Sequence, residues 1–155
     1  MIARDKMLIK GGRYKDDRGV LIYNNDFDMS DVKRSYIVEH DRSFIRAFHG
    51  HLHERKWVQV LEGKFKIVTY KLEPTKVEKE TFWHPELDTQ NIHYMENDGS
   101  VLAIPAGYTN GFQNLTISGK IQFFSDKTVK ESEGDDIRCR WNYFSERIWD
   151  LRKYR

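Results

Sequence analysis

The sequence has only one cysteine, Cys139, among its 155 residues. An internal disulfide is therefore impossible, and a reducing compartment is the simpler expectation. The chain also lacks any apolar run near the ~20 residues of a membrane-spanning helix, and its first residues lack the apolar core of a signal peptide. These absences exclude a disulfide-stabilised secreted domain and a helical membrane protein. They favour a cytoplasmic protein.

A strong charge of either sign is also missing. The 26 basic and 24 acidic residues leave a formal net charge of +2, and they are scattered along the chain. This balance gives no sign of a nucleic-acid or membrane partner, although a small anionic ligand such as a phosphate ester fits it. The length predicts a single domain over residues 1–155, large enough to bury a core.

Helical periodicity is not sustained anywhere, and only three prolines interrupt the chain. Short alternating runs separated by turns dominate instead, and aromatic residues make up 14% of the composition, which favours sheet. About ten short strands with frequent turns predict an all-β fold of jelly-roll type, a sandwich or barrel. The expected strands are Lys6–Lys10, Val20–Tyr23 as a buried run, Arg34–His40, Ile45–His53, Trp57–Leu61, Phe65–Leu72 ended by Glu73-Pro74-Thr75, Glu78–Phe82, Asn91–Met95, Val101–Ile104 and Gly119–Phe124.

The stretch from Ile45 to Gly63 is where we expect the chemistry. His49, His51 and His53 recur at every second position, so a strand places their imidazoles on one face. Lys56 follows a few residues later. Packing alone does not explain three histidines and a lysine together, and this set predicts a functional site.

Two short motifs resemble those of the cupins, small jelly rolls with two motifs on facing strands. Lys56 stands where the first cupin motif has a glutamate, and Asn110 stands where the second has a histidine. The other motif positions match, namely His49, His51 and Gly63 in the first and Gly99, Pro105, Gly107 and Asn114 in the second. A protonated lysine repels a divalent ion and has no lone pair to give, so we expect no metal. Zinc held by the three histidines is the alternative.

Imidazoles and an ammonium group in a metal-free pocket suit proton abstraction next to a carbonyl. A histidine titrates near neutral pH and is an effective base there. A lysine ammonium beside the carbonyl oxygen stabilises the enolate that forms. Residue chemistry therefore predicts an isomerase-type reaction in which His49 and Lys56 act together.

Within the cupins the chain resembles the nucleotide-sugar 3,5-epimerases, of the dTDP-4-dehydrorhamnose 3,5-epimerase type, over nearly its whole length. The segments that carry the resemblance are Asp17-Arg18-Gly19, Ile45–His49, Lys56–Val60, Ile104–Phe112, Arg140-Trp141-Asn142 and Ile148-Trp149. The resemblance implies a dTDP-sugar substrate, a homodimer, a role in surface polysaccharide biosynthesis and no cofactor. It implies that His49 is the base and that Arg18 and Arg46 bind phosphate. The other expected substrate-binding residues are Asn110, Tyr143 and Trp149.

Two catalytic positions depart from the epimerase pattern. Phe123 or Phe124 occupies the place of the family's tyrosine acid, and neither can donate a proton. Tyr143 falls where an aspartate orients the histidine, although Asp135 or Asp136 can take that role.

The chain is also similar to the sugar 3,4-ketoisomerases. Lys33–Ile37 resembles their Lys-Arg-x-Tyr-Tyr, which makes Tyr36 a candidate catalytic residue, and Arg46–His51 resembles their Arg-Gly-Phe-His-Ala-His. In that branch both His49 and His51 move protons on one face of the sugar, and no acid on the opposite face is needed. We expect an epimerase, with a ketoisomerase and a non-catalytic nucleotide-sugar binding module as alternatives.

Overall fold

The computed structural model describes residues 4–41 and 44–151. The predicted turn at 41–43 therefore falls largely outside the described residues. The elements in chain order are α1 (Arg4–Met7), β1 (Leu8–Ile9), β2 (Gly12–Asp16), β3 (Gly19–Tyr23), β4 (Arg34–Asp41), β5 (Ile45–His51), β6 (Lys56–Glu62), β7 (Lys64–Val77), β8 (Glu80–Pro85), η1 (Leu87–Thr89), β9 (Asn91–Glu96), β10 (Val101–Ile104), β11 (Tyr108–Asn114), β12 (Ser118–Ser125), β13 (Ile137–Arg138) and η2 (Glu146–Ile148). Within these ranges no helix is long and apolar enough to cross a membrane.

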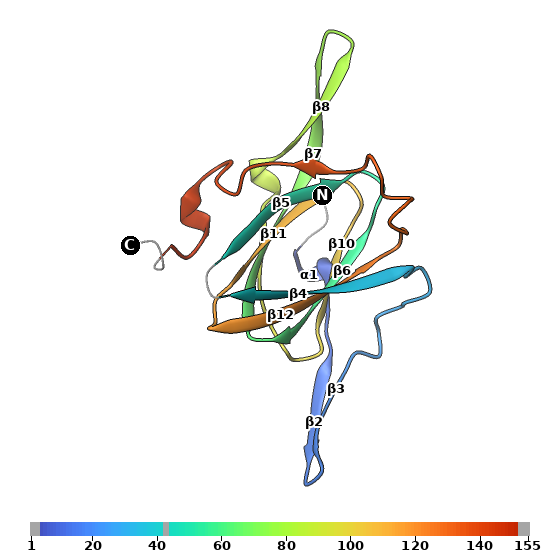
Figure 1. Ribbon diagram of the computed structural model, residues 1–155, viewed down its shortest axis with the longest axis vertical. Helices are drawn as coiled ribbons and strands as arrows, with labels where there is room; N and C mark the ends of the chain where they lie inside the picture. The colour runs from blue at the N-terminus through green and yellow to red at the C-terminus, as the bar shows by residue number, and fades with distance from the viewer. Residues whose placement is uncertain (1–3, 42–43, 152–155) are drawn as a thin grey trace.

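Two antiparallel sheets face each other to form the body (Figure 1). The first sheet has the strand order β1-β10-β6-β12-β4, and the second has the order β13-β5-β11-β7-β8, with β9 also paired to β7. Apart from the consecutive pair β7 and β8, most neighbouring strands come from distant parts of the chain, as in a jelly roll. The predicted all-β fold, a double-stranded β-helix of cupin type, is confirmed.

The main core lies between the two sheets. Alternation along each strand sends one set of side chains inward, and Val58 and Phe123 of the first sheet meet Phe65, Ile67 and Phe112 of the second. All five are at most 6% exposed. The apolar surface that they remove from water provides most of the stabilisation of the body.

The chain after β12, residues 126–151, is called the C-terminal segment, and its last part covers the outer face of the second sheet. Phe48 and Tyr70 point outward from β5 and β7 and pack against Trp149 and Phe144, with ring centroids 5.7 Å apart for Phe48 and Trp149 and 4.9 Å apart for Tyr70 and Phe144. The aromatic residues near the C-terminus therefore pack on the body of the same chain.

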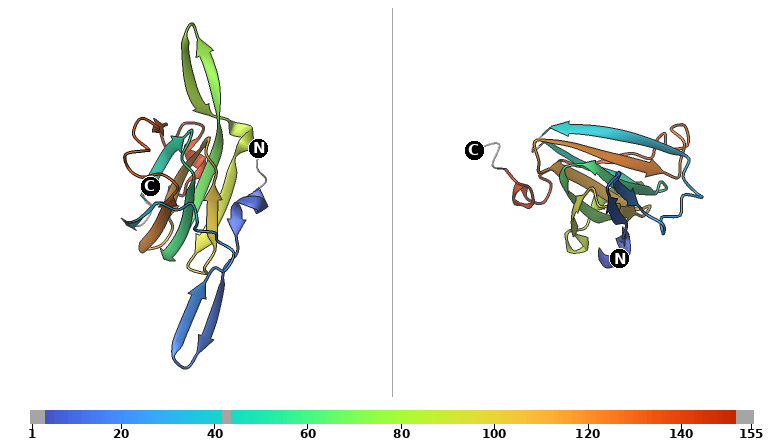
Figure 2. Two further views of the ribbon diagram at one scale, coloured as in Figure 1. Left: turned by 90° about the vertical axis from the view of Figure 1, so that its right-hand side faces the viewer. Right: turned by 90° about the horizontal axis from the view of Figure 1, so that it is seen from below.

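Several sequence-based expectations about the strands were wrong. Residues 6–10 contain the end of α1 and the two-residue β1 rather than one strand. Pro74 does not end the hairpin, because β7 continues to Val77 and its last residues, from Leu72 on, pair with the whole of β8. Leu21, expected in a buried strand, is 61% exposed, because β2 and β3 form a separate two-stranded hairpin. Figure 2 shows these two hairpins projecting from opposite ends of the body.

Candidate active site

A cavity opens between the two sheets, at the inward-facing side chains of five strands. Its walls combine cationic, hydrogen-bonding and aromatic groups, which is the composition of a site for a polar ligand rather than of a packing defect. The lining residues are Tyr36 and Val38 of β4, Arg46 and His49 of β5, Lys56 of β6, Asn110 and Phe112 of β11, and Phe123 of β12.

An irregularity in the pairing of β5 and β11 brings Arg46 and His49 to the same cavity. Residues three apart on a regular strand face opposite sides. Here His49 pairs with Asn110, and the register then shifts so that Arg46 pairs with Phe112. The residue in between is Gly111, where a Cβ would lie 2.4 Å from a side-chain carbon of β5. Such a shift redirects side chains at functional sites.

Lys56 is fixed against two aromatic rings. Its Nζ donates a hydrogen bond of 2.8 Å to the hydroxyl of Tyr36 and lies 5.3 Å and 5.8 Å from the ring centroids of Tyr36 and Phe123. These two rings come from directly paired positions of β4 and β12 and stack 5.2 Å apart. Within the described residues no carboxylate pairs with Lys56, so its charge stays available to a ligand in the cavity.

His49 is half-buried, and its environment favours the neutral imidazole. Burial is the largest cause that lowers its pKa from 6.5, and the positive charge of Arg138 is the next. Lys56 and Arg46 act in the same direction, whereas Asp136 opposes them. A lowered pKa keeps the ring unprotonated at neutral pH, which is the state a general base requires.

The other two predicted histidines lie apart from this cavity. His51 points from the end of β5 towards the C-terminal segment, where its Nδ1 contacts the carbonyl oxygen of Asp135 and lies 3.5 Å from a carboxylate oxygen of Glu54. A carbonyl only accepts hydrogen bonds, so Nδ1 carries the proton. His53 follows the end of β5 and is exposed. His51 shares the strand face of His49 but does not line the cavity, and His53 leaves that face because β5 ends at His51.

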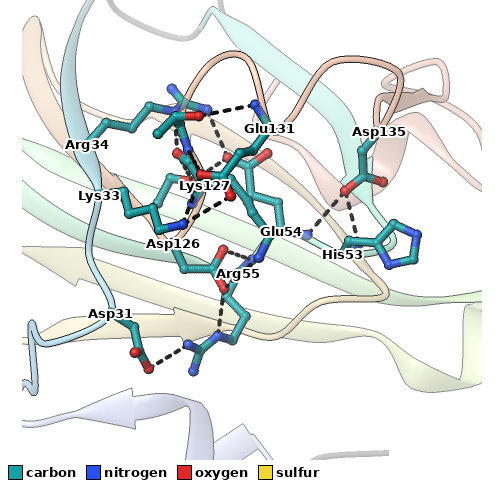
Figure 3. A network of polar contacts seen from close by, with 12 residues as sticks. Asp31, Lys33, Arg34, His53, Glu54, Arg55, Asp126, Lys127, Glu131 and Asp135 are labelled. Atoms are coloured by element: carbon teal, nitrogen blue, oxygen red, sulfur yellow. Dashed lines mark hydrogen bonds and ion pairs between the residues drawn. The ribbon is translucent and has the colours of Figure 1, made fainter.

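Sequence reasoning missed Glu54, which lies at the centre of a buried polar network (Figure 3). Its side chain is fully buried. One carboxylate oxygen accepts hydrogen bonds from Arg34 at 2.8 Å and from the hydroxyl of Ser125 at 2.5 Å. The network joins β4, β12 and the segment between β5 and β6, and no local spacing in the sequence distinguishes Glu54 from an exposed glutamate.

Three predicted substrate-binding residues do not line the cavity of this chain. Arg18 lies at the tip of the β2–β3 hairpin, where its side chain is 85% exposed and pairs with Asp16. Tyr143 is on the surface of the C-terminal segment. Trp149 is buried on the outer face of the second sheet, and its ring nitrogen donates to the carbonyl of Trp141 at 2.9 Å.

Across the described ranges, no group of three or more histidine, cysteine, aspartate or glutamate side chains is placed to hold a metal ion. The cavity residues that occupy the cupin motif positions, Lys56 and Asn110, contribute an ammonium and an amide instead.

Comparisons with known proteins find the same fold in solved structures of dTDP-sugar epimerases and 3,4-ketoisomerases. No protein-family model and no curated protein sequence matches the chain. Among solved structures, a dTDP-4-dehydrorhamnose 3,5-epimerase from Bacillus anthracis with TDP and pyrophosphate bound matches with a TM-score of 0.66 and 17% identity, over 87% of this chain and 78% of that one. The epimerase from Elizabethkingia anophelis matches with 0.65 and 18%, over 87% and 75%.

A sugar 3,4-ketoisomerase variant from Thermoanaerobacterium thermosaccharolyticum, in complex with TDP-4-keto-6-deoxyglucose, also matches. Its TM-score is 0.62 and its identity 20%, over 85% of this chain and 86% of that one. At these identities the likeness establishes a shared fold, and the activity has to be argued from the site.

Proposed function

We propose that the protein is a metal-independent epimerase of a nucleotide-linked 4-keto-6-deoxy sugar, acting at C3, C5 or both in the cytoplasmic synthesis of surface polysaccharide sugars. The observation that carries this proposal is the pairing of His49 with Lys56 in one cavity. A neutral imidazole and an unneutralised ammonium are the two groups that enolate formation needs. The enzymes whose solved structures share this fold act on sugars of this class, which supports the substrate assignment.

In this proposal His49 removes the proton from the carbon next to the ketone. The ammonium of Lys56 faces the ketone oxygen and stabilises the negative charge that develops there. Because Lys56 is already held by the Tyr36 hydroxyl, little reorganisation is needed when that charge appears. Asn110 lies opposite His49 on the neighbouring strand and offers an amide to the sugar hydroxyls.

Epimerisation also requires a proton donor on the other face of the sugar, and Tyr36 is the candidate. Of the two phenylalanines that can occupy the family's tyrosine position, Phe123 lines the cavity, and the ring of Tyr36 stacks on it from the adjacent strand. Its hydroxyl lines the same cavity as His49. The ammonium of Lys56, 2.8 Å away, offers a positive charge to the phenolate oxygen that remains after proton transfer.

The nucleotide and the assembly complete the proposal. Arg46 has an exposed guanidinium at the cavity and suits a diphosphate, most simply that of a dTDP-sugar.

Tyr14 and Leu21 of the β2–β3 hairpin are 58% and 61% exposed, and a two-stranded hairpin of this kind gains stability when a second surface covers it. In the proposed homodimer, the hairpin packs on a second copy and carries Arg18 to that copy's substrate.

Deuterium exchange tests this function directly. Chelator-treated protein is incubated in D₂O with dTDP-, GDP- and CDP-linked 4-keto-6-deoxy sugars, and the products are followed by NMR. We expect deuterium at C3 or C5 with the ketone still at C4. The function is refuted if none of the three substrates acquires deuterium at a carbon next to the ketone.

Replacement of Tyr36 by phenylalanine is expected to separate exchange from inversion. His49 still removes and returns a proton on its own face, so deuterium continues to enter the substrate, although more slowly because Lys56 loses its hydrogen bond to the Tyr36 hydroxyl. The inverted product falls further, by at least about 10²-fold, because the opposite-face acid is gone. The double variant Tyr36→Phe/Phe123→Tyr restores a hydroxyl at the family position and should recover part of the inversion. Wild-type inversion by Tyr36→Phe would exclude Tyr36 as the donor.

A 3,4-ketoisomerase is the second candidate, favoured by the placement of Tyr36 in the cavity. Residues 33–37, which include the start of β4, resemble the ketoisomerase motif. The ketoisomerase reaction needs no acid on the opposite face of the sugar. The same NMR experiment distinguishes the two, because a ketoisomerase moves the ketone to C3. Tight nucleotide-sugar binding without any exchange would instead identify a binding module.

A further inference from the structure

The short strand β13 brings an arginine to the side of His49. β13 pairs with the edge of β5, so that Ile137 lies opposite Gly50 and Arg138 lies opposite His49. Directly opposed residues of an antiparallel pair present their side chains on the same face of the sheet. Arg138 therefore lies at the rim of the face on which His49 lines the cavity, although it is 89 positions away in the sequence.

Arg138 presents a free guanidinium edge. Its Nε donates to Asp136 at 2.8 Å, and among the described contacts none occupies the two terminal nitrogens. The side chain is 70% exposed. Arg46, on the cavity wall, has no ion-pair partner among the residues that the structure describes. Two guanidinium groups thus flank His49, and both lower its pKa, which places their charges within electrostatic reach of the imidazole.

We propose that Arg138 binds the phosphate-bearing part of the substrate together with Arg46, and that Asp135 is the positioning residue that holds β13 in place. The proposal rests on the proposed function, because it assigns the diphosphate of the same nucleotide sugar. A guanidinium held through Nε keeps its terminal N–H pair for a bidentate contact with phosphate oxygens. The Asp136 carboxylate offsets part of the local charge and fixes the direction of this pair.

Asp135 fastens β13 to the body through three backbone contacts. One carboxylate oxygen accepts from the amide of Leu52 at 2.6 Å, and the other accepts from the amides of His53 and Glu54 at 2.9 Å and 3.1 Å. Figure 3 shows Asp135 at the turn that carries His53. Charge-assisted bonds of this kind are stronger than neutral ones. They fix the chain immediately before Ile137, and hence the position of Arg138.

Calorimetric titration with TDP tests the role of Arg138 without requiring turnover. We expect Arg138→Gln to bind TDP ~10- to 100-fold more weakly, the loss that corresponds to charge-assisted hydrogen bonds. Arg147→Gln, an exposed arginine of the same C-terminal segment, is the matched control and should bind TDP as the wild type does. The proposal would be overturned if Arg138→Gln bound TDP as tightly as the wild type does, or if the wild type did not bind TDP.

The role of Asp135 is tested by a double-mutant cycle. Asp135→Asn replaces one acceptor by an amide that faces N–H donors, so β13 loosens and TDP affinity falls. If Asp135 acts through Arg138, the double variant Asp135→Asn/Arg138→Gln has the same TDP affinity as whichever single variant binds TDP more weakly. Losses in binding free energy that add in the double variant would contradict the positioning role. Urea unfolding of each variant confirms that the body is intact.

The two proposals fail separately. TDP binding that is lost in Arg138→Gln, combined with no deuterium exchange in the wild type, would support the anion site and refute the epimerase. Deuterium exchange in the wild type with unchanged TDP affinity in Arg138→Gln would support the epimerase and refute the role of Arg138.

Discussion

Replacement of His49 by alanine is expected to lower kcat for deuterium exchange and for product formation by about 10²- to 10⁴-fold, the usual contribution of a positioned general base. The reason is specific to the cavity. His49 is the one imidazole among the described residues that line it, and the ammonium of Lys56 has no lone pair with which to accept a proton. Substrate KM should change little, because Arg46 and Asn110 remain.

His53→Ala is the matched control for this experiment. His53 comes from the same run of histidines, but its side chain is exposed beyond the end of β5, and the contact that it makes with Asp135 uses only its backbone amide. The control should keep wild-type exchange. Full exchange by a folded His49→Ala protein would show that another group is the base and would remove the foundation of the proposed mechanism.

Much of the fold follows from alternation and turn chemistry, but the partners of the strands do not. Residues 118–125 form a strand in which Ile121 and Phe123 alternate with polar neighbours, and residues 101–104 form a short continuous apolar strand after a turn. Alternation says nothing about which layer covers a strand. The apolar run at Val20–Tyr23 therefore suggested burial, while the chain places it in a hairpin outside both sheets.

The site shows the same division between local and long-range information. Motif spacing identified His49 and Lys56, whose side chains the structure brings to one cavity. Local periodicity alone separates Arg46 from His49, since residues three apart alternate, and only the register shift against β11 joins them. The family resemblance suggested Asp135 or Asp136 as a partner of the histidine, whereas Arg138 reaches His49 only through the pairing of β13 with β5, which a single sequence does not reveal.

The buried carboxylate of Glu54 is expected to matter more for folding than any exposed charge of this chain. Replacement by alanine leaves Arg34 without its 2.8 Å partner and removes the acceptor of the Ser125 hydroxyl. Breaking a buried pair from one side costs about 3–5 kcal/mol because the remaining charge is left uncompensated. The Arg34 side chain is 25% exposed, so water relieves part of that cost. We expect a loss of about 3 kcal/mol in the free energy of unfolding, measured with urea.

Two further variants separate the effect of charge from that of shape. Glu54→Gln keeps an oxygen acceptor for Arg34 and Ser125, so it should lose less stability than Glu54→Ala. Glu39→Ala removes a carboxylate that is 76% exposed and lies 3.7 Å from Lys120, and pairs of this kind contribute at most about 1 kcal/mol. Equal losses for Glu54→Ala and Glu39→Ala would mean that the polar network beneath β4 and β12 does not stabilise the fold. A larger loss for Glu54→Ala would instead show that the network stabilises the fold where it joins Arg34 of β4 to Ser125 of β12.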